Sequence, residues 1–192
     1  MPYTRLRFDP AAENHIIEVG KLITANNTYG TFYDQLDPRA GLGCHDYHVT
    51  LVAGLWMYSD TEVAVALDSV APDLRGMDFT VTIQSWKMSS KGSLQLIVNV
   101  KNIEELQQRI HALLPRGRLF KPPYHITMGT FIGSKQQRRA FYNSLPTKPL
   151  LGLQFQGITV EYENDADRPN PCATPLVTQT PPMVPKPVCG VQ

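Results

Sequence analysis

The strongest constraint on the fold of this chain is a pentapeptide pattern that occurs twice, as YHVTL (residues 47–51) and as YHITM (residues 124–128). After its tyrosine, each copy alternates polar and aliphatic residues, which is typical of a β-strand with one buried face. Side chains at positions i and i+2 of a strand point to the same face. The histidine and threonine of each copy are therefore expected on one surface, opposite aliphatic residues that point into a core.

The rest of the chain predicts an alternation of strands and helices around these two copies. Period-two patterns predict strands at 3–8, 47–56, 78–89, 93–101, 124–132 and 152–163. Apolar residues at helical spacing predict helices at 9–27, 59–74, 102–115 and 134–145, with Asp9 and Asn102 as N-caps. Residues 27–46 and 116–123 are expected to be loops. The order β-α-β-α-β-β-α-β-α-β predicts an α+β fold with two similar halves, each carrying one copy of the pattern.

Length and composition indicate how many domains the chain contains and where the folded part ends. The 192 residues suit one domain, which we place at 1–163. Residues 164–192 are rich in proline and poor in large apolar side chains, so this tail is expected to be disordered. Its PMVP stretch is a weak signal for a partner that binds proline motifs. The default expectation for the domain itself is a monomer.

The charge and the cysteines of the chain limit the ligands, metals and cellular compartment that we expect for it. A net charge of +1 provides no polybasic surface for long nucleic acid or for an anionic membrane. No apolar run is long enough for a transmembrane helix, and MPYTRLRFDP has no apolar core of a secretory signal. The three cysteines, Cys44, Cys172 and Cys189, are widely spaced and form no zinc motif. We therefore expect reduced thiols, no metal, and an intracellular, cytoplasmic protein.

Two imidazoles and two hydroxyls on one surface suit phosphodiester chemistry. A neutral imidazole accepts a proton from the nucleophile, while a protonated imidazole donates one to the leaving oxygen. Both forms are accessible near neutral pH, because the ordinary pKa of histidine is about 6.5. The threonine hydroxyls are able to donate hydrogen bonds to the non-bridging phosphate oxygens. This chemistry needs no cofactor.

The paired motifs HVTL (48–51) and HITM (125–128) resemble the paired His-x-Thr/Ser-x signatures of the 2H phosphoesterase superfamily. The resemblance covers about residues 3–162 in element order and motif spacing. It implies a bilobal fold of two pseudo-symmetric α/β lobes, with antiparallel sheets around a central cleft. It also implies a catalytic quartet of His48, Thr50, His125 and Thr127, with no metal. The superfamily includes cyclic phosphodiesterases, 2′-5′ RNA ligase-like proteins, and enzymes that degrade oligoadenylate or cyclic nucleotide signals.

Several further residues are candidates for substrate binding, each with a structural alternative. Cations beside an aromatic side chain suit a phosphate and a stacked base, which singles out Arg118, Phe120 and Lys121 in the loop at 116–123. Tyr33, with Tyr29 and Phe32, offers stacking surfaces in the segment 27–46. Trp86 either lines the floor of the cleft or belongs to the core. Arg5 and Arg7 either contact phosphate or face solvent. Tyr47 and Tyr124 are expected to pack away from the histidines.

The sequence therefore predicts a metal-independent phosphodiesterase that acts on a small nucleotide or a short oligonucleotide. The expected bond involves a ribose 2′ position, in a 2′-5′ linkage or a 2′,3′-cyclic phosphate. One alternative is a hydrolase of cyclic dinucleotides or oligoadenylates used as immune signals. Another is a module that binds nucleotide or RNA without turnover. The sequence does not assign the acid and base roles to the two histidines.

Overall fold

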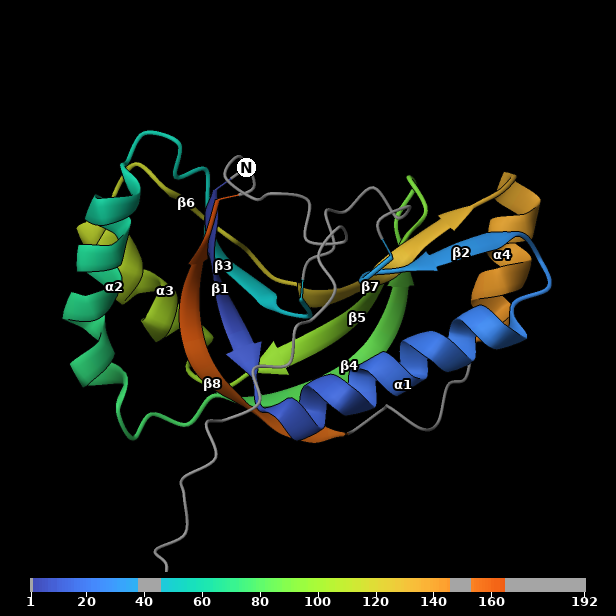
Figure 1. Cartoon of the computed structure of the whole chain (residues 1–192), viewed down its shortest axis with the longest axis horizontal. Helices are drawn as coiled ribbons and strands as arrows, with labels where there is room; N and C mark the ends of the chain where they lie inside the picture. Colours follow the sequence, from blue (N-terminus) through green and yellow to red (C-terminus); the bar gives the residue numbers. More distant parts are fainter. Residues whose placement is uncertain (1, 38–45, 146–152, 165–192) are drawn as a thin grey trace, which may run out of the picture.

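The predicted strands and helices are present, together with two short strands that the sequence did not predict. The computed structural model describes residues 2–37, 46–145 and 153–164. Figure 1 shows the elements in chain order. They are β1 (Tyr3–Phe8), α1 (Pro10–Asn26), β2 (Thr31–Asp34), β3 (Val49–Ala53), α2 (Asp60–Leu74), β4 (Thr80–Met88), β5 (Ser93–Val100), α3 (Ile103–Leu113), β6 (Arg118–Leu119), β7 (Tyr124–Ile132), α4 (Lys135–Ser144) and β8 (Gln154–Glu163). The fold is α+β, as predicted.

Polar caps fix where three of the helices begin. The Asp9 side chain accepts a hydrogen bond of 2.9 Å from the Ala12 N–H at the start of α1, which confirms this predicted cap. A capping box starts α2, in which Ser59 and Glu62 satisfy each other's backbone N–H groups. Ser134 starts α4 in the same way. These caps satisfy backbone donors that the first turn of a helix leaves unpaired.

Asn102 occupies the N-cap position of α3, as predicted, but it does not cap the helix with its side chain. Asn102 has a φ of 57°, in the left-handed region that asparagine tolerates better than most residues, and its side chain makes no capping hydrogen bond. Its side-chain amide instead donates to the backbone oxygen of Asp78 at 2.9 Å. Asp78 lies two residues before β4 and Asn102 two residues after β5, so this bond connects the two ends of the hairpin that β4 and β5 form.

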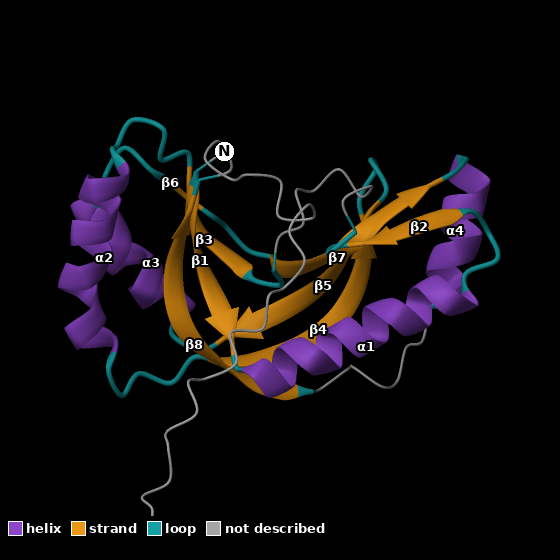
Figure 2. Cartoon of the chain, in the orientation of Figure 1, coloured by secondary structure: helices purple, strands orange, loops and turns teal. Residues whose placement is uncertain are grey.

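Within the described residues, one antiparallel sheet contains all of the strands, in the order β2-β7-β5-β4-β8-β1-β3-β6. The long strand β8 joins its two parts, because Gln154–Gln156 pair with β4 and Gly157–Glu163 pair with β1. Figure 2 shows that the sheet is strongly curved. Four strands separate β3 from β7 in the hydrogen-bonded order, yet the two are in contact. The curvature therefore brings together the two strands that carry the His-x-Thr motifs.

The two additional strands correct the expected loops at 27–46 and 116–123. The strand β2 lies in the first segment and pairs with β7, while β6 lies in the second and pairs with β3. Each forms one edge of the sheet, next to a strand with a His-x-Thr motif. Residues 38–45 of the first segment lie outside the described residues, as do the three cysteines and residues 165–192 of the expected tail.

The hydrophobic core lies between the sheet and the helices, which cover the outside of its bend (Figure 2). The helices α2 and α3 pack at the end formed by β1, β3 and β6, and α1 and α4 cover the end formed by β2 and β7. At the latter end, Phe141 of α4 stacks on Phe131 of β7 with ring centroids 4.6 Å apart. The opposite face of the sheet, called the concave face below, is left uncovered by these helices. None of the helices in the described ranges is long and apolar enough to span a membrane.

Candidate active site

His48 directly precedes β3 and is half-buried. Its Nδ1 lies 2.7 Å from the backbone oxygen of Asp46, and because a carbonyl only accepts, Nδ1 carries the hydrogen. In the neutral ring, Nε2 then holds the lone pair that accepts a proton. The imidazole also stacks on Tyr3 of β1, with ring centroids 5.2 Å apart and an interplanar angle of 25°. A backbone carbonyl and an aromatic ring therefore fix the tautomer and the orientation of His48.

His125 lies in β7, where it is also half-buried. Burial lowers its pKa below the ordinary value of 6.5, and the positive charge of Lys87 lowers it further. A hydrogen bond with the backbone of Pro123 opposes this shift; since proline has no N–H, the acceptor is its carbonyl. Each histidine thus bonds the carbonyl two residues before it. The ring of Phe120 lies beside His125, with centroids 5.3 Å apart.

A β-bulge directly follows each threonine of the two motifs. Thr50 pairs with Arg5, but the next pair of β1 and β3 is Thr4 with Val52, so Leu51 is extra. Thr127 pairs with Gln95, but the next pair of β5 and β7 is Leu94 with Gly129, so Met128 is extra. Bulges of this kind redirect side chains and are frequent near active sites. Both threonines are half-buried on the concave face, and Leu51 and Met128 are fully buried in the core.

The aliphatic residues between the histidines and threonines confirm the predicted division of faces. Val49 and Ile126, like the bulged residues after the threonines, have no exposed surface. The tyrosines before the histidines also point into the core, as predicted, and are 2% (Tyr47) and 6% (Tyr124) exposed. The hydroxyl of Tyr47 donates to Asp34 at 3.5 Å, and burial together with the charge of this carboxylate raises its pKa. Neither tyrosine is placed to act in chemistry on the concave face.

A single buried amide, that of Gln107 in α3, links the two motif strands. Its Nε2 donates to the backbone oxygens of Leu51 (2.8 Å) and Phe120 (2.7 Å), and its Oε1 accepts from the Tyr124 hydroxyl (3.0 Å). Leu51 belongs to β3, and Tyr124 directly precedes His125. We call this arrangement the Gln107 clamp. The sequence contained a signal for it, a glutamine four residues after Ile103 on the apolar stripe of α3, but the partners lie on distant segments.

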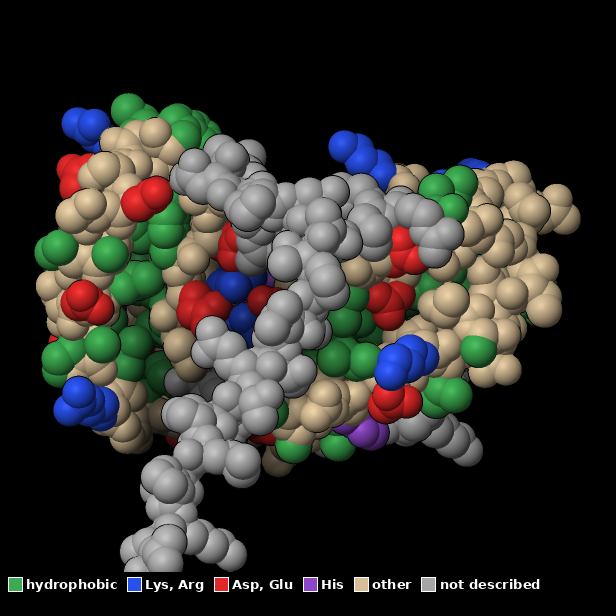
Figure 3. Space-filling view, in the orientation of Figure 1, with side chains coloured by type: hydrophobic (Ala, Val, Ile, Leu, Met, Phe, Trp, Pro, Cys, Tyr) green, Lys and Arg blue, Asp and Glu red, His purple; other side chains and the backbone are tan. Residues whose placement is uncertain are grey.

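The side of the concave face next to His48 carries a network of opposite charges, which we call the arginine–carboxylate wall. Arg5 is 5% exposed and contacts Glu161 (2.9 Å) and Glu163 (3.0 Å) on β8. Arg7 contacts Asp46 (2.8 Å), and its Nε donates to a fourth carboxylate at 2.8 Å. Figure 3 shows basic and acidic side chains side by side in the central hollow. The network consists of Arg5, Arg7, Glu13, Asp46, Glu161 and Glu163.

The structure contradicts one of the two alternatives predicted for these arginines, that they face solvent, whereas contact with phosphate stays a prediction. Neither side chain faces open solvent, and both already bind carboxylates. The burial of Arg5 makes its pairing with Glu161 and Glu163 necessary, because an unpaired buried charge is strongly destabilising. Arg7 also connects the wall to the site, because its partner Asp46 provides the carbonyl that His48 bonds.

Comparison of the chain with family models and with curated proteins gave no match. Any function therefore has to be inferred from the residues of the site. In the part of the chain that the structure describes, no group of three or more His, Cys, Asp or Glu side chains is placed to hold a metal ion.

The remaining candidates for substrate binding occupy different places. Phe120 is half-buried beside His125, and Tyr33 is half-buried in β2, opposite Thr130 of β7. Thr130 is paired in turn with Ser93, which puts Tyr33 on the same face as Gln95 and Thr127. Arg118 and Lys121 are exposed on β6 and on the loop that leads to β7.

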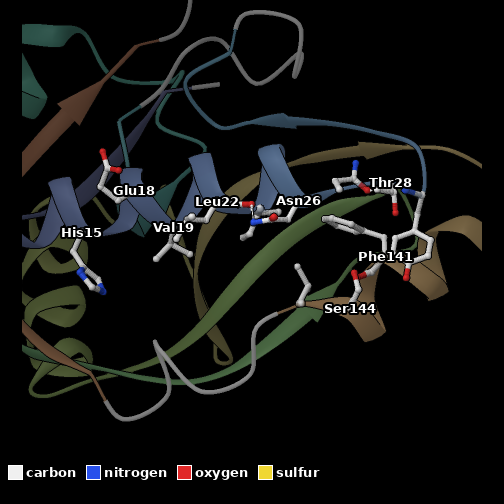
Figure 4. Close-up of a pocket in the computed structure, with 12 residues that line it drawn as sticks. His15, Glu18, Val19, Leu22, Asn26, Thr28, Phe141 and Ser144 are labelled. Atoms are coloured by element: carbon white, nitrogen blue, oxygen red, sulfur yellow. Dashed lines mark hydrogen bonds between the residues drawn. The ribbon is translucent and has the colours of Figure 1, made fainter.

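Three aromatic candidates lie away from the concave face. Trp86 is 7% exposed and lies in a row of core residues with Leu96 and Ile126, so it packs in the core. Phe32 is also buried in the core. Tyr29 is exposed at an apolar hollow of about 490 Å³ between α1 and α4 (Figure 4). None of the four motif residues lines this hollow.

Proposed function

We propose that this chain is a metal-independent phosphodiesterase that cleaves a ribose 2′-linked phosphodiester by acid–base catalysis between His48 and His125. One observation carries the proposal. The curvature of the sheet brings β3 and β7 into contact, and both motif strands direct their histidine and threonine away from the core. In both cases the imidazole bonds the carbonyl two residues before it, which orients the ring.

The environments of the two histidines support different roles. Because burial and Lys87 lower its pKa, His125 is held in the neutral form at neutral pH and is suited to accept a proton. We therefore assign His125 as the general base and His48 as the general acid. A positioned acid or base typically contributes about 10²–10⁴-fold to the rate. The Thr50 and Thr127 hydroxyls would donate hydrogen bonds to the non-bridging oxygens of the phosphate.

With a 2′-5′ linkage, the neighbouring 3′-hydroxyl is the nucleophile. His125 removes its proton, the 3′-oxygen bonds to phosphorus, and the bond from phosphorus to the 5′-oxygen breaks. His48 gives its proton to that leaving oxygen, so the products are a 2′,3′-cyclic phosphate and a free 5′-hydroxyl. With a 2′,3′-cyclic phosphate as substrate, water replaces the 3′-hydroxyl as nucleophile, and one ring ester bond breaks. The two proton transfers come from the histidines, so neither reaction requires a metal.

We further infer that the fold consists of two pseudo-symmetric lobes. In the strand order, β3 and β7 are each second from an end, and each pairs with a short edge strand. Each motif also has a buried tyrosine before its histidine and a bulged residue after its threonine. These shared details support a duplication with the catalytic groups where the two lobes meet.

A direct test uses a panel of substrates in the presence of EDTA. The panel contains 2′-5′ and 3′-5′ oligoadenylates, nucleoside 2′,3′-cyclic phosphates and cyclic dinucleotides, assayed with the wild-type chain, His48→Ala and His125→Ala. We expect turnover of the 2′-linked substrates by the wild type and loss of at least about 10²-fold in each variant. His111→Ala, on the helix α3, is the matched control for removal of an imidazole.

Each outcome has a defined meaning. Full activity in either motif variant would rule out the two-histidine mechanism, and loss of activity in EDTA would rule out metal independence. Turnover confined to cyclic dinucleotides would favour the alternative substrate class. Binding of nucleotides without turnover of any substrate would favour a binding module.

A further inference from the structure

The charges on the concave face are unevenly distributed. On the side of His48, the arginine–carboxylate wall contains two arginines and four carboxylates, a formal excess of negative charge. A substrate with several phosphates is repelled by such a wall unless the phosphates lie elsewhere. The side of the concave face that carries His125 is therefore where additional negative charge of a substrate is best accommodated.

A row of side chains on this other side leads from the site to a lysine. Thr127 of β7 pairs with Gln95 of β5, and Gln95 pairs with Lys87 of β4. Directly paired residues of antiparallel strands point to the same face, so all three side chains lie on the concave face. Two strand spacings of about 4.8 Å each separate the backbones of Thr127 and Lys87.

A β-bulge in β4 is the reason that Lys87 belongs to this row. Ile83 pairs with Val98 and Ser85 with Ile97, so Gln84 is extra and the alternation of β4 changes phase. Beyond the bulge, Trp86 points into the core and Lys87 to the concave face. Lys87 is exposed, and no described carboxylate forms an ion pair with it. It differs in this respect from Arg5 and Arg7, whose charges are already neutralised.

We propose that Thr127, Gln95 and Lys87 form an anion track, in which Lys87 binds a second phosphate of the substrate beside the one that is cleaved. This inference rests on the proposed phosphodiesterase function and specifies its substrate class: a short 2′-linked oligonucleotide that carries a flanking phosphate. Thr127 donates to the phosphate that reacts, Gln95 lies between the two, and the ammonium group of Lys87 pairs with the flanking one. The substrate thus extends away from the arginine–carboxylate wall.

The test compares matched substrates that differ by one phosphate. The probes are a 2′-5′-linked dinucleoside monophosphate, the same dinucleotide with an added phosphate at its 5′ end or at its 2′ end, and a nucleoside 2′,3′-cyclic phosphate. We expect the wild type to have a higher kcat/KM for one of the phosphorylated dinucleotides than for the unphosphorylated one. In Lys87→Gln this preference should fall about ten- to a hundredfold, as for loss of a charged hydrogen bond. Lys87→Arg should retain most of it.

Lys21→Gln is the matched control, because Lys21 is an exposed lysine on α1, where it pairs with Glu18. This variant should keep the wild-type preference. An unchanged preference in Lys87→Gln would overturn the anion track. An equal loss of kcat/KM on every substrate would also overturn it, because Lys87 would then act on the reacting phosphate. If the wild type turned over none of the probes, the proposed function would fail. The track would then be tested by calorimetric binding of the same dinucleotides, where equal affinities for wild type and Lys87→Gln would refute it.

Discussion

Replacing Gln107 with leucine tests whether the alignment of β3 and β7 depends on one buried amide. The substitution keeps the size of the side chain but removes two donors and one acceptor, all of which have partners 2.7–3.0 Å away. Gln107 is 4% exposed, so water cannot readily replace these bonds. The Leu51 carbonyl retains one donor, the Phe120 N–H at 3.0 Å, whereas the Phe120 carbonyl and the Tyr124 hydroxyl lose the partners described above.

The expected loss of stability follows from these three bonds. A hydrogen bond typically contributes about 0.5–1.5 kcal/mol net, and a buried polar group left without a partner costs about 1–3 kcal/mol. Because one carbonyl stays bonded and leucine adds apolar contacts, we expect the free energy of unfolding to fall by about 2–4 kcal/mol. Tyr124→Phe breaks only one of the bonds, so its expected loss is about 1 kcal/mol.

Urea denaturation measures these changes, and Gln108→Leu, at an exposed position of the same helix, is the control. Steady-state assays under conditions where the variant is folded then separate stability from positioning. A misplacement of about 1 Å costs up to about 10²-fold in rate, so kcat should fall more than KM changes. The clamp would be refuted by a stability equal to that of Gln108→Leu. A loss of stability with an unchanged kcat would show that the clamp stabilises the fold without aligning the histidines.

Three further predictions concern the groups of the site itself. If His125 is the base, its protonation stops the reaction. Because its pKa is lowered, the acidic midpoint of the profile of kcat/KM against pH should lie below 6.5. A midpoint above 6.5 would contradict this role. Thr127→Val keeps the branched shape of the side chain and should lower kcat by about 10–10³-fold with an unchanged thermal midpoint of unfolding. A variant with the kcat of the wild type would exclude a role of Thr127 in phosphate binding. Asp46→Asn keeps the carbonyl that His48 bonds but removes a partly exposed partner of Arg7. It should cost at most about 1 kcal/mol in urea denaturation but lower kcat, and an unaffected kcat would show that the ion pair does not orient His48.

Local patterns in the sequence were sufficient to predict the long elements and the faces of the motif strands. Val49 and Ile126 are buried as the alternation requires, and Asp9 begins α1 as its capping preference predicts. The edge strands β2 and β6 were missed because four- and two-residue strands contain too few positions for a period to emerge. They form only because β7 and β3 offer unpaired backbone groups beside them. Asn102 takes the predicted N-cap position, but its side chain does not cap α3 for a related reason: a distant acceptor, the Asp78 carbonyl, competes for it.

The charged residues of the site were hardest to predict, because charge state and partners depend on tertiary contacts. Alternation in β1 put Arg5 and Arg7 on one face, but it could not show that carboxylates from β8, α1 and the segment before β3 converge on them. Gln107 illustrates the same limit. A polar residue on the apolar stripe of a helix indicates that some buried group needs a partner, yet the identity of that partner lies in the packing of three other segments.

Bulges determine which chemical groups the concave face presents. Strict alternation from Val81 and Ile83 would bury Lys87 and expose Trp86 on the concave face. The bulge, which takes Gln84 out of the alternation, reverses this choice, so that the concave face presents a cation and not an aromatic ring. The bulges after Thr50 and Thr127 lie beyond the motif residues, where each ends the regular pairing of its strand directly after the hydroxyl. The face of Lys87 thus depends on the way β4 accommodates Gln84. A deletion of Gln84 would be expected to remove the bulge and leave Trp86 in the core and Lys87 on the concave face, because Ser85, Trp86 and Lys87 would keep their partners on β5. A deletion variant that folds should therefore keep the preference for a flanking phosphate that the anion track provides.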